Sequence, residues 1–256
     1  HRDLHSFPTR RSSDLMLSPL STKLIFASLF CAFIYDAYQS WIINRHVFVE
    51  PVPAIHRYEF KQVAILNVLY FATFGSELAV VSMLPLYFYD VFELNMIHAG
   101  LLASTYALMN LISRPAGGII SDYVGRKSTL LCLTAGLALG YFSFSMIDSS
   151  WPLVFAVVAV MACSFFVQAG EGAVFAVVPL IKRRLTGQIA GMTGAYGNIG
   201  AVCYLALLSY VSYEVFFMII GLSALVGFGV LFFMNEPRGQ MAEIRDDGSV
   251  ELINVA

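Results

Sequence analysis

Charged residues are scarce in this sequence. Asp, Glu, Lys and Arg make up 12% of its 256 residues, whereas hydrophobic residues make up 58%. Soluble globular domains contain about 25% charged and about 45–50% apolar residues, so this composition indicates a membrane protein. The sequence also lacks a long basic tract or acidic block, and its formal net charge is -2. We therefore expect the lipid bilayer and a small molecule as partners, and no nucleic acid.

Groups suited to metal or catalytic chemistry are also few. The four cysteines lie far apart in apolar runs, at Cys31, Cys132, Cys163 and Cys203. No pair has the spacing of a metal site or a redox motif, and the loops contain no nucleophile with a neighbouring base. We therefore expect no enzyme, no metal and no nucleotide or organic cofactor.

Residues 1–15, HRDLHSFPTRRSSDL, differ in composition from everything that follows. They lack the apolar stretch that a signal peptide needs, and they resemble translated sequencing-adapter read-through. We treat them as an artefact and exclude them from the fold. On this interpretation Met16 need not be the natural start of the protein.

A helix needs about 20 predominantly apolar residues to cross a hydrocarbon core of about 30 Å. Seven stretches qualify, at approximately 24–44, 62–89, 96–120, 128–147, 152–180, 187–211 and 214–234. The first is the weakest, because Asp36 and Gln39 interrupt it. We divide the chain into a first helix with a linker (16–60), a six-helix part (61–236) and a polar tail (237–256).

Basic residues follow an alternating pattern along these spans. They precede the second span and follow the third, fifth and seventh: Arg45, Arg57, Lys61, Arg126, Lys127, Lys182, Arg183, Arg184 and Arg238. The loops between contain no Lys or Arg, and Lys23 alone disagrees. Because basic loops stay on the cytoplasmic side, we expect a multi-pass protein of the cytoplasmic membrane with a cytoplasmic carboxyl tail.

Four charged residues lie deep inside the predicted spans. Arg114 is the single basic one, and Asp36, Glu77 and Glu171 are acidic. Each charge at the bilayer centre costs about 2.5–3.5 kcal/mol on insertion scales, so these residues are candidates for function.

Residues 118–127, GIISDYVGRK, fit the pattern G-x-x-x-D-x-x-G-R-K. Its fixed positions are Gly118, Asp122, Gly125, Arg126 and Lys127. Glycine permits a tight turn, the aspartate can cap or charge-pair at a helix end, and the basic pair anchors the cytoplasmic face. The pattern resembles the cytoplasmic loop signature of the major facilitator superfamily, which implies a loop that takes part in conformational switching. Thr129 departs from it, since the family usually has another basic residue there.

Three further stretches resemble the nitrate/nitrite porter family: VLYFATFGSELAVVSMLPLYF, GEGAVFAVVPLIKRRLTGQIAG and GAYGNIGAV. The resemblance covers about Tyr58 to Pro237. Members of the superfamily have two six-helix halves. The resemblance therefore implies an all-α membrane protein truncated to the C-terminal six-helix bundle, the central cytoplasmic linker and one preceding helix. The missing N-terminal half of the same polypeptide, with a second substrate arginine, would be its partner.

Nitrate and nitrite are flat monoanions, and a guanidinium offers them a planar fork of donors. The resemblance implies that Arg114, within SRPAGG, contacts the anion. Asn110 lies one turn away and can donate to the same site. Alternatively, Arg114 lies about 12 Å from Asp122 at the helix end, and can snorkel to the interface or pair with a carboxylate.

Tyr70, Phe74 and Glu77 share one helix face. The resemblance implies that the two rings line the nitrate site, whereas helix packing is the alternative. Glu77 and Glu171 are candidates for proton coupling, which would give anion–proton symport. In the alternative, one of these carboxylates neutralises Arg114 while no anion is bound.

Glycine recurs every third residue at Gly191, Gly194, Gly197 and Gly200. Small residues let helices approach closely and slide, as alternating access requires. The resemblance implies that Gly197 and Asn198 belong to the substrate site, with plain packing as the alternative.

The resemblance therefore implies a secondary active transporter for nitrate or nitrite in nitrate assimilation, working by alternating access and coupled to protons. Two alternatives stay open. One is a major facilitator exporter of a drug or another solute, and the other is a membrane-embedded subunit that does not transport.

Overall fold

The computed structural model describes residues 18–49, 57–236, 239–244 and 250–255. The chain separates into two units, residues 1–57 and 58–256, which we describe one at a time. In the first unit, helix α1 (Pro19–Asn44) begins at Ser18, whose side chain accepts a hydrogen bond from the Ser21 backbone N–H. This N-cap, followed by proline in the first turn, is a common helix start. A short 3-10 helix, η2 (Arg45–Phe48), follows.

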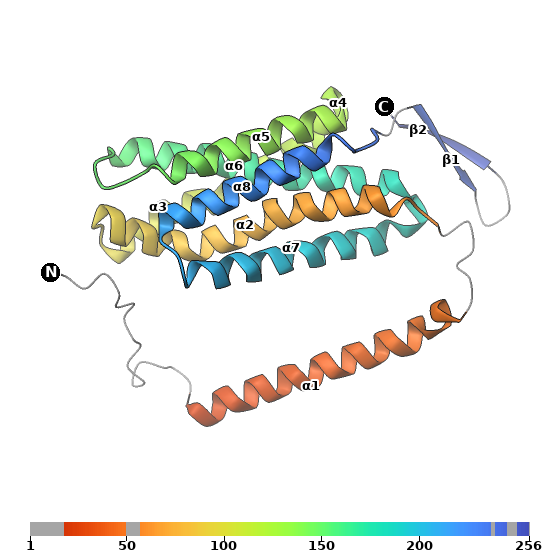
Figure 1. Cartoon of the computed structure of the whole chain (residues 1–256), viewed down its shortest axis with the longest axis horizontal. Coiled ribbons are helices and arrows are strands. Elements are labelled where there is room, and N and C mark those ends of the chain that lie inside the picture. Colours follow the sequence, from red (N-terminus) through yellow and green to blue (C-terminus); the bar gives the residue numbers. More distant parts are fainter. Residues whose placement is uncertain (1–17, 50–56, 237–238, 245–249, 256) are drawn as a thin grey trace. The chain divides into compact units, whose positions relative to one another are not determined.

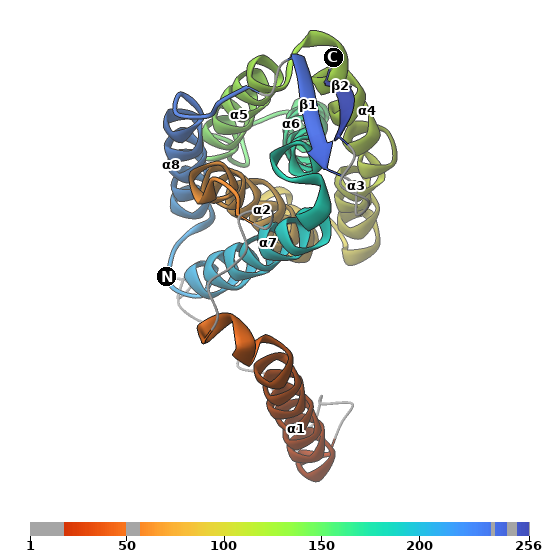
Figure 2. The ribbon, with the colours of Figure 1, turned by 90° about the vertical axis from the view of Figure 1, so that its right-hand side faces the viewer.

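The second unit is a bundle of long helices that lie side by side (Figure 1). They are α2 (Phe60–Phe92), α3 (Met96–Leu108), α4 (Asn110–Val124), α5 (Arg126–Phe144), α6 (Leu153–Ile181), α7 (Thr186–Leu208) and α8 (Tyr213–Leu231), with a 3-10 turn η4 (Arg183–Leu185) before α7. Helix α2 contacts α3, α6, α7 and α8 and occupies the middle of the bundle (Figure 2). Its most apolar window is 72% buried, against 22% to 44% for the other candidate spans of this unit.

Six helical segments among the described residues are long and apolar enough to cross a membrane. They match six of the seven predicted spans, so the all-helical membrane fold is confirmed. The predicted span 187–211 corresponds to α7, which is not among the six. Its 23 residues are long enough at about 35 Å. Glycine, threonine and asparagine lower its mean hydropathy, so the close packing of α7 depends on small residues more than on bulk apolarity.

The predicted span 96–120 is one apolar stretch in sequence but two helices in the structure. Helices α3 and α4 meet at Met109. Pro115 lies in α4, and proline cannot donate a hydrogen bond to the carbonyl four residues earlier, so it weakens the helix over the preceding turns. The interruption falls in that region and places Asn110 in the first turn of α4.

Two apolar clusters of the bundle flank a buried polar layer. The Tyr87 cluster contains residues 79–88 of α2 that face inward, and the Leu66 cluster contains those of 63–70. The polar residues between or beside these clusters are Thr73, Ser76, Glu77, Thr134, Gln168 and Glu171, all buried. Buried polar groups need hydrogen-bond partners, so this layer differs from an apolar core and is the candidate position for a binding site.

Two short strands follow the bundle. Strand β1 (Gly239–Ile244) pairs antiparallel with β2 (Val250–Val255), in a register that runs from Gly239 opposite Val255 to Ile244 opposite Val250. We expected only a polar tail over 237–256, so this strand pair is an addition to the all-α prediction.

Candidate anion site

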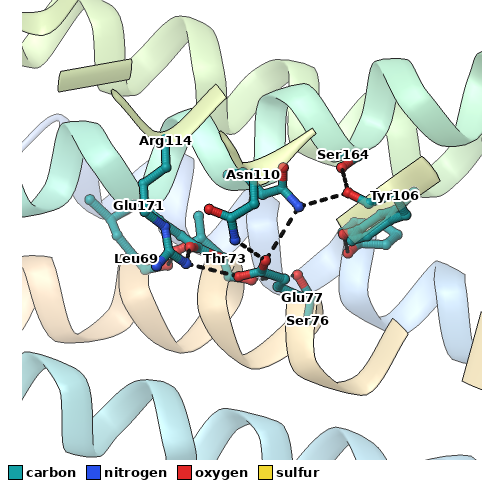
Figure 3. Close-up of polar contacts among 11 residues, drawn as sticks. Leu69, Thr73, Ser76, Glu77, Tyr106, Asn110, Arg114, Ser164 and Glu171 are labelled. Carbon is teal, nitrogen blue, oxygen red and sulfur yellow. Dashed lines mark hydrogen bonds and ion pairs between the residues drawn. The ribbon is translucent and has the colours of Figure 1, made fainter. Parts of the chain in front are cut away.

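Arg114 points into the bundle, where it meets two acidic side chains (Figure 3). Its Nη2 atom donates to Glu77 Oε2 on α2 at 3.0 Å and to Glu171 Oε2 on α6. The Arg114 side chain keeps 38% of its surface exposed, whereas Glu77 and Glu171 keep 7% and 1%. Arg114 therefore pairs with carboxylates in this structure instead of snorkelling to the helix end.

Glu77 receives three hydrogen-bond donors. Asn110 Nδ2 donates to Oε1 at 2.6 Å, Gln168 Nε2 donates to the same oxygen at 3.3 Å, and Arg114 donates to Oε2. An ionised carboxylate is an acceptor only, so this environment fits the charged form of Glu77. The Asn110 amide, which we expected to face the substrate, is engaged by Glu77 here.

Glu171 has a different environment. Its Oε2 receives Arg114, but its Oε1 is buried without a hydrogen-bond partner. The Gln168 side-chain oxygen, one turn earlier on the same face of α6, is also buried without a partner. Two acceptors therefore lie in the polar layer without a donor.

Close backbone contact between α4 and α6 brings Arg114 to Glu171. A Cβ atom on Gly172 would overlap the Arg114 carbonyl, and one on Gly117 would overlap the Ala169 carbonyl. Sequence reasoning missed this contact. The signal was present in the small residues Gly117 and Gly118 opposite Ala169 and Gly172, because small residues allow close approach of helices in membranes.

Two stacked rings stand beside the guanidinium. The Tyr70 and Phe74 rings are 5.0 Å apart and inclined by 8°, and the Arg114 Cζ atom lies 5.9 Å from the centre of the Phe74 ring. The Phe175 and Tyr70 rings pack edge to face, with their centres 5.0 Å apart. The predicted face of α2 therefore brings an aromatic pair and Glu77 to the same place as Arg114.

Helix α7 supports these rings through one of its glycines. A Cβ on Gly197 would lie 2.6 Å from Tyr70 Cδ1 and 2.8 Å from Phe74 Cδ1. Gly200 packs just as closely against the α2 backbone, whereas Gly191 and Gly194 have nothing within 4 Å of a built Cβ. Two of the four regularly spaced glycines of α7, Gly197 and Gly200, therefore contact α2.

Asn198 is not brought to Arg114 by any contact among the described residues. It is exposed on α7, and its Nδ2 donates to the Gly194 carbonyl one turn earlier at 3.0 Å. Gly197, its neighbour in sequence, is the residue of this pair that touches the aromatic rings.

Most residues of the predicted loop motif form the turn between α4 and α5, and one takes part in helix packing. Gly125 has φ of 107°, a conformation that favours glycine, at the turn between α4 and α5. Asp122 pairs with Arg126 across this turn at 3.0 Å. Lys127 Nζ donates to the carbonyls of Phe232 and Met234 at the end of α8, at 2.9 and 2.8 Å. Gly118 lies inside α4. A Cβ atom added to it would lie 3.7 Å from the Gly172 carbonyl oxygen, so Gly118 belongs to the contact between α4 and α6.

This arrangement can accept an anion at one edge of the guanidinium. Both carboxylates bond to Nη2, so neither occupies Nη1. The cluster of one arginine with two ionised glutamates carries one net negative charge, which opposes an entering anion. Protonation of one carboxyl would remove that charge.

A family model described as Major Facilitator Superfamily matches residues 66–251. The chain is 46% identical over 240 residues to the nitrate/nitrite transporter NrtP of Picosynechococcus sp., covering 86% of this chain and 45% of that protein. It is 43% identical over 225 residues to NrtP of Nostoc punctiforme, covering 86% of this chain and 44% of that protein. The chain thus spans about half the length of the curated relatives it matches.

A solved structure shares the fold. The proton:xylose symporter XylE bound to 6-bromo-6-deoxy-D-glucose is similar with a TM-score of 0.54 at 14% identity, covering 70% of this chain and 45% of that chain. At this identity the likeness shows the fold alone. The chain is therefore a multi-pass membrane protein that belongs to the Major Facilitator Superfamily and is related to the NrtP nitrate/nitrite transporters.

Proposed function

We propose that this chain provides the C-terminal half of a transporter that moves nitrate or nitrite across the cytoplasmic membrane by alternating access. Its relatives NrtP are called nitrate/nitrite transporters, and the matched region is about half of their length. The first helix and linker would belong to residues 16–60, the six-helix half to 61–236 and a cytoplasmic tail to 237–256. The alternating basic loops support a cytoplasmic position for the Gly125 turn.

The observation that supports an anion site is the guanidinium of Arg114 inside the bundle. Its Nη1 edge is not used by Glu77 or Glu171, and its side chain is 38% exposed. A planar anion can accept a hydrogen bond from Nη1 without displacing either carboxylate, and a second parallel donor becomes available when one carboxylate releases Nη2. An arginine from the N-terminal half would complete the clamp.

The aromatic and amide residues take supporting roles in this proposal. Tyr70 and Phe74 form a flat wall for a flat ligand, and Gly197 leaves room for that wall. Asn110 holds Glu77 in place beside the arginine. Asn198 would contact the anion only after its amide leaves the Gly194 carbonyl.

We also propose that transport is coupled to protons. Two ionised carboxylates on one guanidinium leave a net negative charge that repels an anion. A proton on one carboxylate removes that repulsion. Anion and proton would therefore enter together, as a symporter requires.

Uptake of labelled nitrate and nitrite by the full-length transporter in a host that lacks its own uptake system tests this function. We expect uptake by the parent and its loss in Arg114→Ala at equal membrane expression. The exposed Arg45→Ala variant serves as control and should transport normally. Parent protein that expresses well but takes up neither anion would overturn the proposal.

A further inference from the structure

The two glutamates that share Arg114 differ in what surrounds the rest of each carboxyl group. Both accept from the same Nη2 atom, so their attraction to the arginine is alike in kind. The differences lie in the second oxygen of each carboxyl. Those differences assign the two residues separate tasks.

Glu77 is fully engaged as an acceptor. Its Oε1 receives the amides of Asn110 and Gln168, and its Oε2 receives Arg114. A proton on either oxygen would face a donor and would cost a hydrogen bond. The Gln168 amide is fixed in this orientation because its Nε2 also donates to the Tyr106 carbonyl at 2.9 Å.

Glu171 lacks a donor where Glu77 has two. Its Oε1 is buried and unpartnered, and an ionised oxygen without a donor in a buried position is far costlier than a neutral hydroxyl. The Gln168 Oε1 atom, also buried and unpartnered, lies one turn away on the same helix face. Arg114 Nε is a buried donor that also lacks a partner, and it bonds to neither oxygen. A proton on Glu171 would supply a donor to this pair of acceptors.

Each helix packed against α6 carries other titratable groups. Helix α2 contributes Glu77 and Tyr70, α4 contributes Arg114, and α3 contributes Tyr106, whose hydroxyl lies 3.3 Å from that of Tyr141 on α5. Helix α7 contributes Tyr204, whose hydroxyl bonds to Ser223. Tyrosine titrates near 10 in water, so among these described groups the two carboxyls are the ones suited to exchange protons near neutral pH.

We propose that Glu171 carries the coupled proton and that Glu77 stays ionised as the permanent partner of Arg114. This assignment rests on the proposed anion transport. Protonated Glu171 leaves Arg114 and Glu77 as a neutral pair, to which the anion adds. By reciprocity, a bound anion strengthens proton binding at Glu171.

Nitrate binding to the purified full-length transporter, measured from acid to alkaline pH with proton uptake followed in weak buffer, tests the assignment. In the parent, one linked proton predicts an affinity that falls about tenfold per pH unit above the titration of the carboxyl. In Glu171→Gln, which keeps a neutral side chain of the same size, we expect a flat profile and no proton uptake. In liposomes this variant should exchange nitrate for nitrate without accumulating it on a proton gradient.

Glu77→Gln is the matched comparison, because it makes the same chemical change on the other partner of Arg114. It should keep the pH slope and the proton uptake at an altered affinity. Glu171→Asp retains a titratable group and should restore the slope, which guards against misfolding of the glutamine variant.

The opposite pattern, with a flat profile in Glu77→Gln and a normal slope in Glu171→Gln, would overturn the assignment. Two flat profiles, or two normal ones, would overturn it as well. A parent that binds no nitrate at any pH would instead overturn the proposed function on which the assignment rests.

Discussion

Replacing Gly197 with alanine should disable the site without touching Arg114. The new Cβ would lie 2.6 Å from Tyr70 Cδ1 and 2.8 Å from Phe74 Cδ1. Carbon atoms in contact prefer about 3.5–4.0 Å, so the rings or α7 must move by about 1 Å. Phe74 lies 5.9 Å from the guanidinium carbon, so its shift changes the space beside the proposed anion edge. Misplacement by about 1 Å can lower a rate that depends on positioning by up to about 100-fold.

We therefore expect Gly197→Ala to lower the initial rate of labelled nitrate uptake in proteoliposomes by about tenfold or more. Gly194→Ala is the control, because the same change there meets nothing within 4 Å. Both variants gain up to about 1 kcal/mol of helix propensity, so propensity cancels in the comparison. Equal uptake by the two variants, at equal amounts of folded protein, would refute the reasoning.

Three further predictions follow from contacts elsewhere in the bundle. Gly172→Ala should lower the free energy of unfolding by about 1–3 kcal/mol, read as a lower melting temperature in detergent, because its Cβ overlaps the Arg114 carbonyl. Lys127→Met should lower the melting temperature by removing two hydrogen bonds to carbonyls at the end of α8, at about 1–3 kcal/mol in total, and an unchanged value would count against that clamp. The Ser150 hydroxyl and backbone N–H hold the pKa of Asp148 below its ordinary value, which stabilises the fold at neutral pH and stops doing so as pH falls through the lowered pKa. Parent and Ser150→Ala should accordingly differ in melting temperature at neutral pH and converge in acid, whereas a difference that grows in acid would contradict this.

Hydropathy predicted the helices well because the cost of placing polar residues in lipid acts on every residue of a span. It missed features that depend on single residues. The helix breaks at Met109, six residues before Pro115, and the low mean hydropathy of α7 reflects the glycines that let Gly197 and Gly200 touch α2.

The charged residues of the site could be selected from sequence, because a charge in a span needs a reason. Arg114, Glu77 and Glu171 were selected in this way, and the structure brings them together. Pairing of Arg114 with one carboxylate was an alternative from the sequence. Its pairing with both could not be derived, since the distance between α4 and α6 depends on how Gly172 meets the Arg114 carbonyl. Asp36 was selected on the same grounds, and it is exposed on α1.

Asn110 and Asn198 show the limit of a motif read along one helix. Each was expected to offer its amide to an anion. In the structure Asn110 donates to Glu77, a residue on another helix, and Asn198 donates to its own helix at Gly194, so contact of either amide with an anion stays a prediction. Hydrogen-bond partners across helices depend on rotation and depth in the bundle, which a periodic pattern does not specify.

Equilibrium binding of nitrate to the purified full-length transporter, compared between the parent and Arg114→Lys, tests the central role of the guanidinium most directly. Lysine keeps the positive charge but loses the planar fork, and a hydrogen bond to a charged group contributes about 1.5–3 kcal/mol. We expect Arg114→Lys to bind nitrate about 10- to 100-fold more weakly than the parent while remaining folded. Affinity within about twofold of the parent would contradict a site built on the fork of Arg114.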